Sequence, residues 1–313
     1  MNTSQEFSEI VVSPDAIGGS PGQFPIELPP SRRELNLPAD RPVASNELDA
    51  AKGSKSDRRP AIPPIPLVEV FGLPIAKFTF EETVAAVGQR IELGEPCYFI
   101  TANLHYARLC RRNRELAEVN RRAAFLVADG MPLVWWSRWQ GTSLPERVTG
   151  ADLVWALAEL AAQRRYRVFL LGGRAGVADR AAEKLCGRFP GLVICGTACP
   201  QLDRLTPDEE QRLLETLARS GTQLLFAALG QPKGELWLAR NCGRWGNAVA
   251  VQIGASLDFI AGTLRRAPRV WQRLGLEWAY RLITEPRRLL PRYAADASFL
   301  LTAIIDSVPR RRT

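Results

Sequence analysis

The sequence predicts an α/β fold in which a mostly parallel sheet lies between two layers of helices, followed by a helical, arginine-rich appendage. The first observation is a series of short apolar runs that are continuous rather than alternating, as in parallel strands covered on both faces. These runs span residues 97–101, 125–128, 168–171, 192–195, 224–229 and 248–253. The second is that helical stretches alternate with the runs. The third is that the strand pattern stops after Gly262. We therefore expect a Rossmann-like three-layer sandwich over residues 63–262 and an appendage over 263–313.

Helices between the apolar runs are indicated by composition and by capping signals. Residues 151–163 and 175–188 are rich in Ala, Leu and Glu, which favour helix. Another helix is predicted to begin at Thr206, where a hydroxyl N-cap is followed by Pro207 and then by acidic residues at the positive helix end.

The first 62 residues have a different composition. They are rich in Pro, Ser, Asp and Glu and have few aromatic residues, so they are predicted to form a disordered arm. The sequence also shows neither a secretory signal pattern nor an apolar run near the ~18 residues that cross a bilayer. These observations predict a cytoplasmic protein that can be peripheral on the inner face of the plasma membrane.

Positive charge is concentrated near the C-terminus. The net charge is +8, and residues 263–313 hold eleven Arg, no Lys and four acids, a local balance of +7. Arginine favours bidentate recognition of phosphate or carboxylate, so an anionic partner is expected. The last predicted helix, residues 286–306, places arginines ahead of an apolar stretch, as in a helix on a membrane surface. The alternative is a terminal helix that docks on the core.

Polar residues and glycines follow nearly all of the predicted strands. In an open α/β sheet ligands bind beyond the carboxyl ends of the strands, so these residues predict one shared cleft. They are Asn103, His105, Asp129, Gly130, Gly172, Gly173, Gly230, Lys233, Gly254 and Asp258.

Asp129 is the carboxylate best placed to act as a base, because it directly follows a buried strand and Gly130 allows close approach. The alternative is that Asp129 only caps the helix that begins near Met131. The glycines of residues 172–176 lie between a strand and a helix, where backbone N–H groups could cradle a diphosphate. The segment is neither a complete GxGxxG nor a Walker A loop, so a plain tight turn is equally compatible.

The sequence offers few residues that could bind a metal ion. His105 is the only histidine, and a structural role is favoured for it. Paired carboxylates such as DxD do not follow the predicted strands, so neither a metal nor another cofactor is expected. Arg147, Gly150 and Asp152 are at the start of a predicted helix, where Thr149 or Asp152 could simply be the cap.

An ordered series of short motifs resembles the WecG/TagA/CpsF glycosyltransferases over about residues 67–293. The motifs lie at 101–103, 128–132, 147–153, 171–173, 230–237, 254–259, 261–268, 276–282 and 285–293. One departure is Gly234, since the family usually has Gln immediately before the residue that matches Glu235.

The resemblance implies an inverting, metal-independent transferase that uses a UDP-sugar donor. Members pass N-acetylmannosamine, its uronic acid or glucose to an undecaprenyl-diphosphate-linked sugar, for teichoic acid, common antigen or exopolysaccharide. Asp129 then matches the base, with Thr101 and Asn103 beside it, and the appendage is expected to close over the site, reach the acceptor diphosphate and contact the membrane. The predicted substrate-binding residues are Gly130, Arg147, Asp152, Gly172, Gly173, Gly230, Lys233, Glu235, Asp258, Arg266, Arg281 and Arg288.

The chemistry of the residues agrees with this, because inverting transfer needs one carboxylate for the acceptor hydroxyl and cations for the departing UDP. One rival is a nicotinamide-dependent oxidoreductase, which the incomplete glycine motif and the missing ribose-binding acid disfavour. A second is a nucleic-acid-binding protein, which a pI near 9.5 and the aromatic residues Trp271 and Trp278 would suit. Nucleic-acid binding does not explain the polar residues at the strand ends, however. The expected partners are the two sugar substrates and the inner membrane surface, without nucleic acid, and a homo-oligomer is compatible with the sequence.

Overall fold

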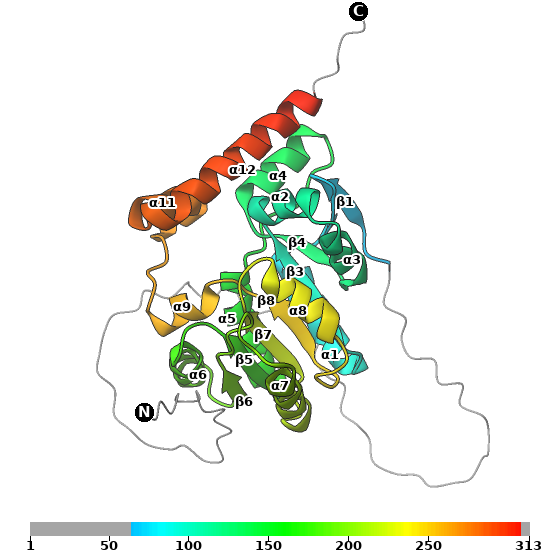
Figure 1. Cartoon of the computed structure of the whole chain (residues 1–313), viewed down its shortest axis with the longest axis vertical. Coiled ribbons are helices and arrows are strands. Elements are labelled where there is room, and N and C mark those ends of the chain that lie inside the picture. The colour runs from blue at the N-terminus through cyan, green and yellow to red at the C-terminus, as the bar shows by residue number, and fades with distance from the viewer. Residues whose placement is uncertain (1–63, 308–313) are drawn as a thin grey trace, which may run out of the picture. The chain divides into compact units, whose positions relative to one another are not determined.

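The computed structural model describes residues 64–307, so the predicted disordered arm, residues 1–62, lies outside the described residues. An eight-stranded sheet is the centre of the fold (Figure 1). Its strands are β1 (Leu67–Val70), β2 (Leu73–Ala76), β3 (Cys97–Ala102), β4 (Leu126–Ala128), β5 (Arg167–Gly172), β6 (Val193–Ala198), β7 (Leu224–Ala228) and β8 (Val249–Gln252). Their order across the sheet is β1-β2-β4-β3-β8-β7-β5-β6.

All neighbouring strands are parallel except β1 and β2, so the predicted mostly parallel sheet is confirmed. The antiparallel edge hairpin β1–β2 was not predicted. Its two strands are only four residues long, and Phe71 and Gly72 connect them with φ values of 53° and 80°. Positive φ at both turn positions suits a tight hairpin, but Phe-Gly is not among the usual hairpin turn sequences, so the signal was weak.

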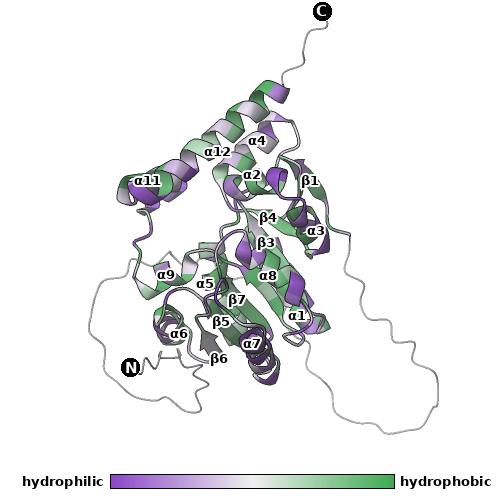
Figure 2. Ribbon diagram, viewed as in Figure 1, coloured by the Kyte–Doolittle hydropathy of each residue, from purple (hydrophilic) through white to green (hydrophobic). Residues whose placement is uncertain are grey.

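Helices cover both faces of the sheet, as the continuous apolar strands require. Residues of β5 alternate between the two cores: Phe169 belongs to one and Leu170 to the other. Figure 2 shows hydrophobic strands inside, with hydrophilic residues on the outer helices such as α7. The first core is closed by α2 (Leu104–Arg112), α3 (Glu115–Arg122), α4 (Met131–Trp139), α7 (Pro207–Arg219) and α8 (Lys233–Asn241). The second is closed by α1 (Phe80–Leu93), α5 (Gly150–Arg164), α6 (Val177–Arg188) and α9 (Ser256–Ala261).

The helix starts predicted from caps are present. Thr206 caps α7 in a reciprocal capping box with Glu209, and Thr149 caps α5 by accepting from the Asp152 N–H at 3.1 Å. A hydroxyl ahead of an acid three residues later therefore fixes the start of α7, as the sequence indicated.

The C-terminal region is helical, as predicted: α10 (Arg269–Arg273), α11 (Glu277–Thr284) and α12 (Pro286–Ser307) follow the sheet. Helix α12 docks on α2 through the buried carboxylate of Asp296, whose Oδ1 lies 2.6 Å from Arg108 Nε and 3.3 Å from His105 Nδ1. One turn on, Phe299 lies against Phe71, with ring centroids 5.5 Å apart. One face of α12 thus docks on the core; membrane association and the domain boundary at 262 stay predictions.

Within residues 64–307, none of the helices combines the length and the apolar composition needed to cross a bilayer.

Asp296 should make a large contribution to stability. Burial alone would raise the pKa of Asp296, but His105 and Arg108 outweigh it and hold that pKa below its ordinary value. A lowered pKa means that the stabilisation is present at neutral pH and is lost on acidification. Asp296→Ala should lower the free energy of unfolding at pH 7 by about 3 kcal/mol, as for one partner removed from a buried ion pair. Urea denaturation measures it.

Asp306→Ala is the matched control on the same helix. Asp306 is exposed and lies 3.8 Å from Arg111, so its loss should cost less than about 1 kcal/mol. Equal losses in the two variants would contradict the docking role of Asp296.

Candidate active site

A cavity of about 940 Å³ lies at the carboxyl ends of β3, β4 and β8. The helices that follow β3 and β8, α2 and α9, pack on opposite faces of the sheet. The cavity therefore lies at a topological switch point, the usual ligand position in an open α/β sheet. Arg281, Arg288 and Arg292 from the C-terminal helices line it together with the strand ends.

Asp129 is half-buried in the wall of this cavity, directly after β4. Its backbone N–H donates to Ala102 O at 2.7 Å, and its Oδ2 accepts from the N–H of Gly150, the first residue of α5, at 3.3 Å. The alternative that Asp129 caps α4 is wrong, because Gly130 holds the N-cap position and that helix has no side-chain cap. The carboxylate instead lies at the start of α5.

Burial raises the pKa of Asp129 to about 6, although the Gly150 N–H and the Arg147 guanidinium oppose the rise. A carboxylate with a pKa near 6 is a stronger base than an exposed one and is still ionised at pH 7. The position, the hydrogen bond and the pKa together suit removal of a proton from a bound hydroxyl.

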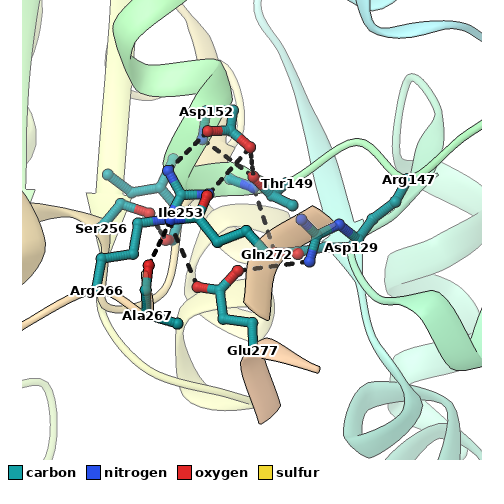
Figure 3. Close-up of polar contacts among 11 residues, drawn as sticks. Asp129, Arg147, Thr149, Asp152, Ile253, Ser256, Arg266, Ala267, Gln272 and Glu277 are labelled. Atoms are coloured by element: carbon teal, nitrogen blue, oxygen red, sulfur yellow. Dashed lines mark hydrogen bonds and ion pairs between the residues drawn. The ribbon is translucent and has the colours of Figure 1, made fainter. Parts of the chain in front are cut away.

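An ion-pair network connects α5 with α11 beside Asp129 (Figure 3). Arg266 donates to both carboxylate oxygens of Asp152, at 2.7 and 3.0 Å, and its Nε lies 3.5 Å from Glu277. The other oxygen of Glu277 accepts from Arg147 at 3.5 Å. Arg147 lines the cavity, whereas Asp152 and Arg266 pair with each other and are not among its lining residues. In this structure these two predicted substrate-binding residues hold α5 and the C-terminal region together.

Thr101 and Asn103 both line the cavity, and both use side-chain atoms to hold the backbone. Thr101 Oγ1 donates to Gln252 O at 2.9 Å, which joins the ends of β3 and β8. Asn103 caps α2, with its Oδ1 accepting from the Tyr106 N–H at 3.0 Å. The cap uses the oxygen of Asn103, so its amide NH₂ is the group that it can present to a ligand.

A second, smaller hollow of about 520 Å³ adjoins the first and shares Gly230 and Asp258 with it. Gly172, Gly173 and Lys233 line it, so the residues predicted for one shared cleft lie in two adjoining hollows. The Gly173 N–H already donates to Ala228 O at 3.1 Å, so this amide is not free to cradle a phosphate.

Gly172 is required for close packing against β7. Its φ is 105°, and a Cβ there would lie 2.5 Å from Ala228 O. Lys233 forms an ion pair with Asp203 at the edge of the same hollow. The two glycines therefore act first as packing residues of a tight strand-to-helix turn.

Glu235 lies outside both hollows. Its side chain is fully buried on α8, and burial raises the pKa of Glu235 to about 7. Glu235 therefore lines neither hollow, and its role in substrate binding stays a prediction.

Gln252 lines the cavity and was not singled out from the sequence. Its side chain accepts from the Leu229 N–H and donates to Gly230 O, both at 3.3 Å. A Cβ at Gly234 would lie 1.9 Å from Gln252 Nε2. The Gln252 amide thus fills the space above Gly234 and ties β8 to the Gly230 loop.

Three arginines line the C-terminal side of the cavity. Arg281 lies over the Phe259 ring at 5.5 Å, and Arg288 pairs with Glu285, its Nε donating at 2.7 Å. Burial lowers the pKa of Arg292, and the nearby Arg281 and Arg288 lower it further, although Asp296 opposes the shift. Arg292 belongs to the family-like segment 285–293 but was not among the predicted substrate-binding residues, although its spacing of four residues from Arg288 was an available signal.

Among residues 64–307, no three His, Cys, Asp or Glu side chains are grouped so that they could hold a metal ion. Metal independence stays a prediction.

Comparisons with known proteins agree with the geometry. Residues 68–313 match the family model described as "Glycosyl transferase WecG/TagA/CpsF family". A relative from Bacillus spizizenii (strain ATCC 23059 / NRRL B-14472 / W23) is 32% identical over 198 residues, which cover 63% of this chain and 75% of the relative. That relative is named N-acetylglucosaminyldiphosphoundecaprenol N-acetyl-beta-D-mannosaminyltransferase.

Gly234→Ala should destabilise the fold, because the new Cβ would displace the Gln252 amide. We expect a loss of about 1–3 kcal/mol, as for other overpacked core positions. Thermal and urea unfolding measure it, and Gln252→Ala in the same chain should recover part of the loss by freeing the space.

Gly187→Ala is the matched control, since a Cβ there, also on a helix, meets nothing within 4 Å. This variant should be neutral or slightly more stable, since Ala favours helix. If both glycine variants behave alike, the contact with Gln252 does not limit position 234.

Proposed function

We propose that this chain, which belongs to the WecG/TagA/CpsF family of glycosyltransferases, moves a sugar from a UDP-sugar to a sugar carried on a polyprenyl diphosphate, with inversion at the anomeric carbon. The observation that carries the proposal is one cavity that holds both Asp129, with its raised pKa, and the arginines of the C-terminal helices. A base and a group of cations are the two parts that this reaction needs.

In the proposed reaction Asp129 accepts the proton of the acceptor hydroxyl as its oxygen attacks the anomeric carbon of the donor. The new glycosidic bond forms on the face opposite UDP, and the bond between the anomeric carbon and the UDP oxygen breaks. UDP departs with the bonding electron pair. Thr101 holds the strand end beside the base, and the Asn103 amide is positioned to orient the acceptor sugar.

The smaller hollow is the proposed nucleotide site. It lies at the carboxyl ends of β5 and β7, and it opens into the larger cavity at Gly230 and Asp258. A donor bound there would direct its sugar toward Asp129. Lys233 and Arg174 at its edge supply positive charge near the diphosphate.

The arginines of α11 and α12 are the proposed site of the acceptor diphosphate. Arg281, Arg288 and Arg292 bring three positive charges to one part of the cavity. Among the ion pairs of residues 64–307, Arg288 pairs with Glu285 and Arg292 lies 3.9 Å from Asp296. Phosphate oxygens match this arrangement.

The relative from B. spizizenii suggests the substrate pair. By its name it transfers N-acetylmannosamine to N-acetylglucosaminyl-diphospho-undecaprenol. We infer the same class of reaction here, with N-acetylmannosamine, its uronic acid or glucose as the sugar, in cell-surface polysaccharide synthesis at the inner face of the plasma membrane. Family membership also disfavours the oxidoreductase and nucleic-acid alternatives.

Asp129→Asn should lower kcat by two to four orders of magnitude, the range for a lost general base. In the wild type, kcat/KM should rise with pH through about 6, because the base must be ionised. UDP release with a lipid-linked N-acetylglucosamine acceptor measures both, and near wild-type turnover in the variant would exclude Asp129 as the base.

The same variant provides its own test of folding. The pKa of Asp129 is raised in the fold, so its ionisation lowers stability as pH rises from about 4 to 6. Asp129→Asn should therefore be more stable than the wild type at pH 7, by up to about 3 kcal/mol, and the gain should shrink toward pH 4.

Arg288→Ala should lower kcat/KM for the lipid-linked acceptor by about 10- to 100-fold, the value of one charge-assisted hydrogen bond. The melting temperature should stay within the range of a surface substitution, since Arg288 is exposed. Arg287→Ala is the matched control: this arginine is next to Arg288, is exposed and does not line the cavity. Equal kinetics in the two variants would show that Arg288 is only a surface ion-pair partner of Glu285.

A further inference from the structure

The face of α12 that lines the cavity changes in polarity along the helix. Its lining residues include Arg288, Arg292, Asp296, Leu300 and Ile304, which recur every four positions. At 1.5 Å per residue this row spans about 24 Å. The row begins with two arginines, continues with the Asp296 carboxylate that Arg108 neutralises, and ends with two apolar side chains.

The apolar end of this row faces α4 (Figure 1). Phe71 stacks on Trp136 of α4, with ring centroids 4.4 Å apart, and also lies against Phe299 of α12. Phe71 therefore holds the C-terminal half of α12 near α4. The cavity continues between the two helices as a groove, which we define by Trp135, Trp139, Leu300 and Ile304.

The groove exposes apolar area that the fold itself does not cover. Trp135 is 44% exposed, Trp139 56% and Ile304 38%. Large apolar side chains that are exposed singly are common, but three along one concave surface are typical of a binding site.

The groove is continuous with the proposed reaction centre. Glu277, which pairs with Arg147 beside Asp129, lies one helical turn before Arg281. Trp278 of α11 lies against Tyr293 of α12, with ring centroids 6.2 Å apart, and Arg281 and Arg292 line the same cavity. Arg292 lies two turns before Leu300 on α12. Along the cavity the order is therefore carboxylate base, arginines, apolar groove.

We propose that the groove between α4 and α12 binds the first isoprene units of the lipid-linked acceptor. The inference rests on the proposed function, because the order of base, cations and apolar wall matches an acceptor in which sugar, diphosphate and hydrocarbon follow one another. From Asp296 to Ile304 the helix advances about 12 Å, so the groove holds only the start of the chain.

Isothermal titration calorimetry with the full chain tests the proposal without sugar transfer. The probes are farnesyl diphosphate, at a concentration at which it is monomeric, and inorganic diphosphate. The wild type should bind farnesyl diphosphate at least about tenfold more tightly, from burial of prenyl carbons against the apolar wall. The double variant Trp139→Ser/Ile304→Asn should lose this difference and retain its affinity for inorganic diphosphate.

The matched control is Leu301→Asn/Ile305→Asn. These residues are on the same helix and are 61% and 71% exposed, but they do not line the cavity. The control should keep the tenfold preference. Loss of the preference in the control as well would assign it to general apolar adhesion and overturn the proposal.

Two other results would also overturn it: no preference for farnesyl diphosphate in the wild type, or the same preference in the groove variant. If the groove variant instead abolishes self-association of the chain in sedimentation while the preference persists, a second copy covers the groove. Failure of the proposed function is distinguishable from failure of this inference. The chain would then transfer no sugar to any lipid-linked acceptor, whatever its preference for farnesyl diphosphate in calorimetry.

Discussion

The carboxylate of Glu277 connects the two parts of the molecule that the candidate active site needs. One of its oxygens accepts from Arg147, which faces Asp129, and the other lies near Arg266, whose guanidinium is held by Asp152. Asp152 is itself fixed by the Thr149 cap at the start of α5, where Gly150 donates to Asp129. The C-terminal helices, the start of α5 and the proposed base are therefore positioned by one network. The side chains of Arg147, Arg266 and Glu277 are largely shielded from water, so each of these charges depends on its partner.

This network explains why the arginines of the C-terminal region have different roles. Arg266 makes a bidentate pair with Asp152 and lies near Glu277, whereas Arg281, Arg288 and Arg292 line the cavity wall together. Clustered like charges raise the free energy of the empty protein. An anionic ligand would reduce this repulsion, so ligand binding should raise the free energy of unfolding.

The sequence predicted the sheet, and it predicted several residues that line the cavity, because both follow from local patterns. Continuous apolar runs specify buried parallel strands, and the residues directly after those strands must meet at one edge. Asp129 and Gly230 were found in this way, whereas Thr101 came from the family resemblance. Burial and pairing partners depend on contacts distant in sequence, so the fully buried Glu235 and the pairing of Asp152 with Arg266 could not be predicted. The short hairpin β1–β2 was missed because its turn sequence is atypical.

The glycine at position 234, where the family usually has Gln, can be explained only from the structure. From the sequence, Gly234 suggested the loss of a polar side chain near the Gly230 loop. In the structure the space above Gly234 is filled by the amide of Gln252, which holds both the Leu229 N–H and Gly230 O. The backbone of the same Gln252 accepts from Thr101, so one residue joins the strand end beside the proposed base to the loop beside the proposed nucleotide site. A glycine at 234 is then the condition for this link, because any side chain there would occupy the place of the amide.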